Sequence, residues 1–129
     1  MKLRAQREGL AIPVTVVTAN LAKDTLVKLT ADNTVDKADA NAHAIGRLVV
    51  PSRTANGPGT VETRYKEKVE IKTTAVIAIG VYVKLTAPDG TTGENTVGVW
   101  VSGTDGWERL YGVACKAAGS GGVAEVLTF

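Results

Sequence analysis

Twelve residues near the middle of the chain restrict its fold more than any other segment does. In VETRYKEKVEIK, residues 61–72, every even position is charged, and every odd position except Glu67 is uncharged. Successive side chains of a β-strand point to opposite faces, so a period of two is typical of a strand with one face in solvent. The run therefore predicts a long strand with one wet face.

A second run, AVIAIGVYVKLT at residues 75–86, is almost continuously apolar and rich in β-branched residues. Such a strand is covered on both faces, either within its own domain or by another subunit. Shorter apolar runs separated by turn residues, for example Asp32-Asn33 and Pro88-Asp89-Gly90, predict further strands. The sequence thus predicts an all-β fold, a compact β-sandwich or β-barrel.

The chain has 129 residues and a net charge of +2, from 15 Lys and Arg against 13 Asp and Glu. Its length predicts a single β domain over residues 12–129. We interpret the polar residues 1–11 as an extended N-terminal arm. The start is read as mature sequence and not as a signal peptide, because charged residues crowd its front and Pro13, Thr15 and Thr18 interrupt the apolar run. The small net charge argues against nucleic-acid binding, and no apolar stretch reaches the ~20 residues of a membrane helix. We expect no direct contact with nucleic acid or membrane and synthesis in the cytoplasm.

Residues that carry catalysis or bind metals are sparse. His43 and Cys115 are the single histidine and cysteine, and neither lies in a recognisable nucleophile motif. Three aspartates at positions 32, 36 and 39 lack the central glycine and closing glutamate of a calcium loop. The glycine groups at 57–59 and 119–122 lack the residues that follow a phosphate-binding loop. We therefore expect no enzyme activity, no metal site and no cofactor.

Three of the six aromatic residues, Trp100, Trp107 and Tyr111, surround the turn sequence SGTDG at 102–106. Aromatic side chains so concentrated pack a core, form a contact with a subunit or partner, or provide a platform on which sugars stack. We interpret them as a core or subunit contact, and the sugar platform remains the alternative.

The pentapeptide VKLTA occurs twice, at residues 27–31 and 83–87. After each copy come a polar stretch, a segment centred on Gly46 or Gly112, a patch of small residues and a closing strand. Gly46 lies 19 positions after Val27, and Gly112 lies 29 after Val83, so the second copy carries about ten extra residues. We place these in PDGTTGEN or in the hairpin between the two tryptophans. The pattern predicts a degenerate duplication with halves at about 25–73 and 81–129; the alternative is a chance alignment of valines and glycines.

The segments VKLTADNTVDKADANAHAIGRLVV, IGVYVKLTAPDG and ERLYGVACKAAGSGGVAEVLTF resemble the capsid decoration (cement) proteins of tailed bacteriophages, in their two-repeat form. The resemblance covers roughly residues 25–129 and rests on short motifs of low complexity. It implies a structural protein on the exterior of the virion that binds the major capsid protein on the outside of the phage head and stabilises the expanded capsid, often as a homotrimer.

The resemblance also implies a role for the N-terminal arm, which in such proteins often reaches a neighbouring capsomer. It matches this chain by position and not by residue. Lys2, Arg4 and Arg7 are then the candidate contacts with acidic groups on the shell, and a frayed terminus is the alternative. A second hypothesis is a carbohydrate-binding β module of a phage fibre or adhesin, which would use Trp100, Trp107 and Tyr111.

Overall fold

A computed structural model describes residues 2–6, 10–40, 42–63 and 67–129, the first of these ranges by its backbone alone. The described chain is built from strands and one short 3-10 turn, which confirms the predicted all-β fold. The elements are β1 (Lys2–Gln6), β2 (Ala11–Val16), β3 (Leu26–Ala31), β4 (Thr34–Lys37), β5 (Gly46–Val50), β6 (Gly57–Thr63), β7 (Glu67–Thr73), β8 (Tyr82–Thr86), β9 (Thr96–Val99), η1 (Trp107–Arg109), β10 (Leu110–Lys116) and β11 (Val123–Thr128).

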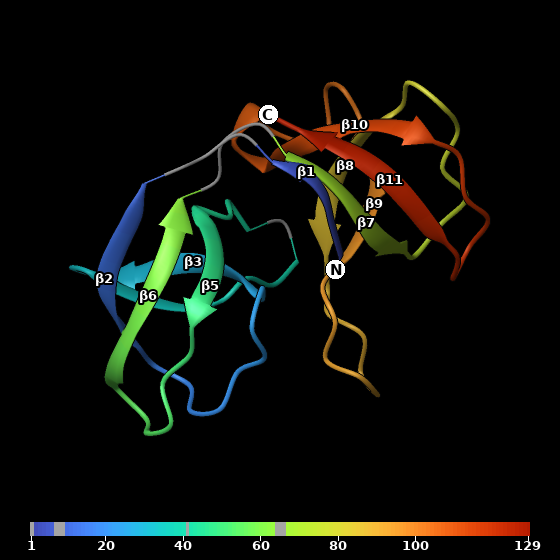
Figure 1. Cartoon of the computed structure of the whole chain (residues 1–129). Helices are drawn as coiled ribbons and strands as arrows, with labels where there is room; N and C mark the ends of the chain where they lie inside the picture. Colours follow the sequence, from blue (N-terminus) through green and yellow to red (C-terminus); the bar gives the residue numbers. More distant parts are fainter. Residues whose placement is uncertain (1, 7–9, 41, 64–66) are drawn as a thin grey trace. The chain divides into compact units, whose positions relative to one another are not determined.

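Strands β2 to β6 form a closed barrel in the order β2-β4-β3-β5-β6 (Figure 1, blue to green). The ring closes through a short parallel pairing of β2 with β4, and its other strand pairs are antiparallel. Inward-facing side chains of all five strands make its core: Val14, Val16, Val27, Val35, Leu48 and Val61. We call this barrel 1. Its small, β-branched core explains how a chain with few aromatic residues fills a barrel interior.

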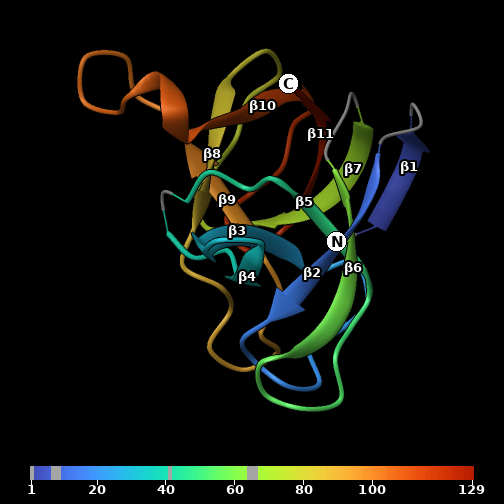
Figure 2. The same cartoon turned by 90° about the vertical axis from the view of Figure 1, so that its left-hand side faces the viewer.

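Strands β7 to β11 form a second ring, barrel 2, in the order β7-β11-β10-β8-β9. A short parallel pairing of β7 with β9 closes it. The first strand, β1, adds to β7 as a sixth strand and pairs with it antiparallel from Lys2 opposite Glu70 to Gln6 opposite Glu67. Figure 2 shows β1 beside β7. The segment interpreted as an arm therefore pairs with barrel 2 along residues 2–6.

The two barrels share one topology, and this confirms the internal duplication. Strands β2 to β6 correspond in order to β7 to β11, and in each barrel the first and third strands make the parallel closure. Val27 pairs with Gly46 in barrel 1, as Val83 pairs with Gly112 in barrel 2. The two copies of VKLTA thus occupy equivalent places at the second strand of each ring.

The backbone repeats even outside the strands. The N–H of Asp24 donates to the carbonyl of Leu48 at 2.7 Å, and the N–H of Gly80 donates to that of Ala114 at 2.8 Å. Asp24 and Gly80 both adopt left-handed backbone conformations, with φ of 67° and 80°. The same conformation is needed at both places, and glycine and aspartate are among the residues that accept it.

The extra residues of the second copy lie in two loops. Val27 and Val83 are 56 positions apart, Thr34 and Thr96 are 62 apart, and Gly46 and Gly112 are 66 apart. Six residues are therefore added between β8 and β9, within PDGTTGEN, and four between β9 and β10, around Trp107. The sequence offered these as alternatives, and the structure uses both.

The boundaries between the elements differ from those expected. The alternating run at 61–72 spans the end of β6 and most of β7, which belong to different barrels. The apolar run at 75–86 becomes a strand only from Tyr82, and Val76 and Ile79 are 71% and 72% exposed. Period and hydropathy are local properties, whereas the end of a strand depends on where its pairing partner ends.

The predicted domain limits also differ from the observed division. The chain forms two compact units: residues 8–38 with 44–65, and residues 1–7 and 39–43 with 66–129. The structural repeats run from β2 to β6 and from β7 to β11, so each begins one strand before the predicted halves at 25–73 and 81–129. The repeated pentapeptide marks the second strand of each unit, and the sequences of the first strands, AIPVTV and EKVEIKT, differ too much to reveal their equivalence.

Candidate interaction surface

The polar groups that could carry chemistry are dispersed. Among the described residues, no group of three or more His, Cys, Asp or Glu is placed to hold a metal ion. His43 is exposed, and its Nδ1 lies 2.9 Å from the backbone carbonyl oxygen of Glu108. Cys115 is also exposed. In the aspartate cluster, Asp36 accepts hydrogen bonds from the Thr18 hydroxyl and the Lys37 N–H, both at 2.8 Å, which is a local structural role.

None of the helical segments in the described part of the chain has the length and apolarity needed to cross a membrane.

Barrel 2 carries a group of aromatic side chains in mutual contact, which we call the aromatic face: Tyr82, Trp100, Trp107 and Phe129. The ring of Tyr82 meets those of Trp100 and Phe129 edge to face, with centroids 6.1 and 6.0 Å apart. Trp107 packs on Trp100 at 5.2 Å with a tilt of 34° between the ring planes. These spacings are those of favourable aromatic pairs. Tyr82 and Phe129 are exposed, and Trp107 is the most exposed of the four at 76%.

Apolar residues extend the aromatic face across three strands of barrel 2. Val113 on β10 lies opposite Tyr82 on β8 and opposite Leu127 on β11, so the three form one row across the sheet. Leu127 is exposed, as is Val101, which directly follows Trp100. A contiguous apolar surface of this kind on a small protein usually marks a contact with another macromolecule.

Barrel 1 presents a different row at the equivalent positions. There Leu26, Arg47 and Glu62 lie opposite one another on β3, β5 and β6. Leu26 is buried, and the Arg47 guanidinium pairs with the carboxylates of Asp24 and Glu62, at 2.5 and 2.9 Å. In barrel 1 this row carries ion pairs, whereas in barrel 2 it is apolar, with Tyr82 and Leu127 exposed and Val113 half-buried between them. The apolar row is therefore not a requirement of the barrel fold.

Asp105 organises the loop that presents Trp107. Its carboxylate is almost completely buried, accepts the N–H of Val101 at 2.8 Å, and pairs with Lys84 Nζ at 2.7 Å and Arg109 Nη1 at 3.6 Å. The hydrogen bond from Lys84 and the one from the Val101 N–H hold the pKa of Asp105 below its usual value. Trp100 supports the same loop, because its Nε1–H donates to the carbonyl of Gly106 at 3.0 Å. Lys84 belongs to the second VKLTA, which ties the repeat to this loop.

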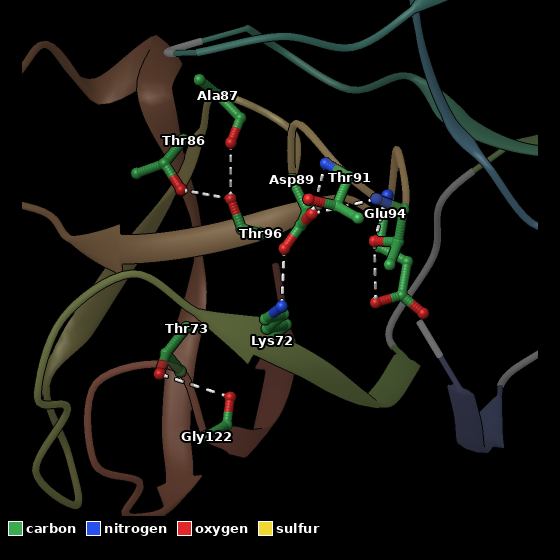
Figure 3. Close-up of polar contacts among 10 residues, drawn as sticks. Lys72, Thr73, Thr86, Ala87, Asp89, Thr91, Glu94, Thr96 and Gly122 are labelled. Carbon is green, nitrogen blue, oxygen red and sulfur yellow. Dashed lines mark hydrogen bonds and ion pairs between the residues drawn. The ribbon is translucent and has the colours of Figure 1, made fainter.

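The longer loop between β8 and β9 is held by Asp89 (Figure 3). Its carboxylate pairs with Lys72 Nζ at 2.6 Å and accepts the N–H groups of Thr91 and Thr92 at 2.8 and 3.0 Å. The hydrogen bond with Lys72, followed by those from the two threonine N–H groups, lowers the pKa of Asp89 strongly. The same contact raises the pKa of Lys72. The ion pair between Asp89 and Lys72 therefore connects this loop to β7.

The structure separates the residues that the sequence grouped as one partner contact. Trp107 is on the surface, and Trp100 is largely buried beneath it. Tyr111 is 2% exposed and lies among the buried core residues of its unit, so it does not contribute to the aromatic face. For the arm, the backbones of Lys2 and Arg4 belong to β1, but their side chains and the whole of Arg7 lie outside the described residues.

Sequence reasoning missed Tyr82, Phe129 and Leu127. These residues come from β8 and from the C-terminal strand region, so no local spacing connects them with the two tryptophans. One signal existed within the repeat. Tyr82 stands directly before the second VKLTA, and Leu26 stands directly before the first. Because one copy has leucine at this position, the duplicated fold does not need an aromatic residue there.

Comparison with known proteins gives a likeness in fold. No protein-family model matches the chain, and no curated protein matches it. Among solved structures, the N base of the head fibre gp8.5 of bacteriophage phi29 is similar, with a TM-score of 0.53 and 15% sequence identity. The similarity covers 93% of each chain. The two chains compared therefore share a fold along almost their whole lengths.

Proposed function

We propose that this protein is a structural component of a phage virion, which binds the outer surface of the head and stabilises the expanded capsid. The observation that carries the proposal is the shared fold with a head-fibre base over 93% of both chains. The resemblance of the repeated motifs to phage decoration proteins supports the same conclusion.

The role needs compact folded units and a contact surface. Each half of the chain is a closed barrel, and barrel 2 carries the aromatic face. Two closed barrels leave few strand edges that could deform or aggregate. A subunit that binds the expanded shell and not its precursor stabilises the expanded form by mass action. The proposal needs no active site, metal, cofactor, nucleic acid or membrane.

We assign the aromatic face to the contact with the major capsid protein. Exposed Trp and Tyr side chains surrounded by apolar residues are typical of the centre of a protein interface. The N-terminal Lys2, Arg4 and Arg7 provide positive charges for acidic groups of the shell, and a homotrimer is the expected assembly. Sedimentation equilibrium of the free protein measures the oligomeric state separately from shell binding.

The proposal is tested by co-sedimentation with empty heads assembled from the major capsid protein of the same virus. We expect saturable binding, in a fixed ratio to capsomers, to expanded heads and little binding to unexpanded heads. Absence of binding to both forms would contradict the proposal. Removal of residues 1–9 measures the contribution of the N-terminal segment, and unchanged affinity would contradict its assignment as a shell contact.

The duplication supplies a matched control for the aromatic face. The double variant Val113→Arg/Leu127→Glu places in barrel 2 the residues that barrel 1 has at Arg47 and Glu62. Barrel 1 accommodates this pair, so the variant should fold, but it covers the apolar row with charge. We expect it to lose binding to expanded heads. Unchanged binding by a folded variant would exclude the aromatic face as the contact.

A carbohydrate-binding module is a second candidate, favoured by the exposed Trp107 ring packed on Trp100. An aromatic ring presented in this way can stack against the apolar face of a sugar. Glycan-array binding that disappears in a folded Trp107→Ala variant would support this function. If the protein binds no glycan and still binds heads, the carbohydrate function is excluded.

A further inference from the structure

Strand β1 is additional to the barrel that it joins. The ring β7-β11-β10-β8-β9 closes without it, and β7 is the one described strand with which β1 pairs. Among the described residues, barrel 1 has no counterpart of β1 and still closes with five strands. The duplication therefore shows that this barrel does not require a sixth strand.

In barrel 1, the equivalent edge of β2 pairs with β4 only at Thr15 and Val16, and no other described strand pairs with its first residues on that side. Pro13 pairs with Thr60 on β6 as Glu70 pairs with Glu125 on β11, so Pro13 is the counterpart of the residue opposite Lys2. An open groove of about 500 Å³ lies there, lined by Ile12, Pro13, Val14, Thr15 and Asn33. Barrel 1 closes as a five-stranded ring without a strand added at this edge, among the residues that the structure describes.

Pro13 disfavours the addition of a strand at this edge of barrel 1. In β2, the N–H of Thr15 points to the β4 side and donates to the carbonyl of Asn33 at 2.9 Å. Alternate residues of a strand direct their N–H groups to the same edge, so residue 13 would donate there as well, but proline has no N–H. A proline on an edge protects it against strand addition. Glu70, at the equivalent position of β7, has the backbone N–H that Pro13 lacks.

We propose that β1 is an exchangeable strand, which pairs with β7 of its own chain or with β7 of a second copy in the same register. The pairing is identical in both cases, so exchange costs little once copies are close together. When copies are held side by side, the effective concentration of the neighbour's β7 rises, so it competes with the chain's own β7 for β1. This proposal concerns contacts between copies and does not depend on binding to a phage head.

Disulfide trapping between two full-length chains tests the exchange. Ala5 lies opposite Lys68, and antiparallel partners have Cα atoms about 4.5–5.5 Å apart, which a disulfide can bridge. One chain carries Ala5→Cys and the other Lys68→Cys, both with Cys115→Ser because Cys115 is exposed. A single chain with both cysteines reports the pairing within one copy. The matched control replaces Lys68→Cys by Ala11→Cys, the equivalent position in barrel 1.

We expect the double-cysteine chain to form its internal disulfide, and the mixed chains to form several-fold more linked dimer than the Ala11 control. An internal disulfide without linked dimer would overturn the exchange. Failure to form the internal disulfide would overturn the pairing of β1 with β7 on which it rests. Adding Pro13→Glu to the Ala11→Cys chain should increase linkage to Ala5→Cys, and no increase would overturn the role assigned to Pro13.

Discussion

Single glycines show how closely the strands of each barrel approach. A Cβ atom at Gly46 or Gly112 would lie less than 3.0 Å from the carbonyl oxygen of Glu62 or Leu127, a separation that real Cβ atoms do not show. The two positions are equivalent in the duplication, so the same close approach is built twice. This close approach of two strands is the physical reason why both repeats have glycine at these positions, Gly46 and Gly112.

Gly112→Ala should therefore destabilise the protein by about 1–3 kcal/mol, the usual cost of forcing extra atoms into a packed site. Gly90→Ala is the control, because nothing lies within 4 Å of a Cβ added there. Urea denaturation of both variants measures the difference. Equal stabilities would show that β10 and β11 can separate without cost.

Truncation of the two aromatic residues Tyr111 and Trp107, near the loop at 101–106, should change the stability by very different amounts. Tyr111 is buried, so Tyr111→Ala should lower the free energy of unfolding by about 3–5 kcal/mol. Trp107 is exposed, so Trp107→Ala should leave the melting temperature almost unchanged while reducing partner binding. Thermal unfolding followed by circular dichroism distinguishes them. A large loss of stability in Trp107→Ala would assign that ring to the core.

The lowered pKa of Asp89 predicts a dependence of stability on pH. Because its folded-state pKa lies below the unfolded value of about 3.9, its contribution is complete above that value and is lost as the pH falls through the folded-state pKa. Asp89→Asn should therefore be less stable than the parent at pH 6, with a difference that shrinks under strongly acidic conditions. Melting temperatures measured between pH 7 and pH 2 test this. A constant difference would exclude the carboxylate charge as the cause.

At the scale of elements, the duplication shows which loops the barrel needs. Barrel 1 joins β3 to β4 with the short turn at Asp32-Asn33, whereas barrel 2 uses residues 87–95 between β8 and β9. Replacing the longer loop by the shorter turn should preserve the barrel, because the strand pairing on both sides is the same. The variant should lose the stability that the Lys72 to Asp89 pair supplies.

Far-UV circular dichroism and amide exchange of β8 and β9 measure the result of this replacement. Retained protection of both strands is expected. Loss of protection would mean that the longer loop, and not the strand pairing, holds β9 in place.

Strand prediction from the sequence succeeded where the pattern was local. Alternation identified the strand content of 61–72, and the repeated pentapeptide identified equivalent strands. The same pattern could not show that β6 and β7 belong to different barrels. Nor could it show that Val76 and Ile79 precede β8 and remain exposed. Both depend on which distant strand supplies the hydrogen bonds.

At the scale of the whole molecule, the two five-stranded rings share one topology, and their surfaces differ. The row Leu26, Arg47 and Glu62 carries ion pairs in barrel 1, and the row Tyr82, Val113 and Leu127 is apolar in barrel 2. The duplication thus provides one scaffold in two versions, one of which has an exposed aromatic face. This asymmetry locates the candidate interaction surface on barrel 2.

Val113→Arg/Leu127→Glu should therefore keep a melting temperature close to that of the parent, because barrel 1 already accommodates an Arg to Glu pair at these positions. Differential scanning calorimetry measures this. Unfolding of the variant would show that the apolar row stabilises barrel 2 itself, and would remove the argument that it is available for a partner.

The sequence by itself determined the all-β content and the duplication, because strand periodicity and repeats are properties of neighbouring residues. It also singled out Trp100 and Trp107. Tertiary structure alone decided that Tyr111 is interior, that Tyr82, Leu127 and Phe129 join the two tryptophans, and that β1 pairs with β7. The physical reason is ring closure, since the face on which a side chain emerges depends on the register between strands far apart in the chain.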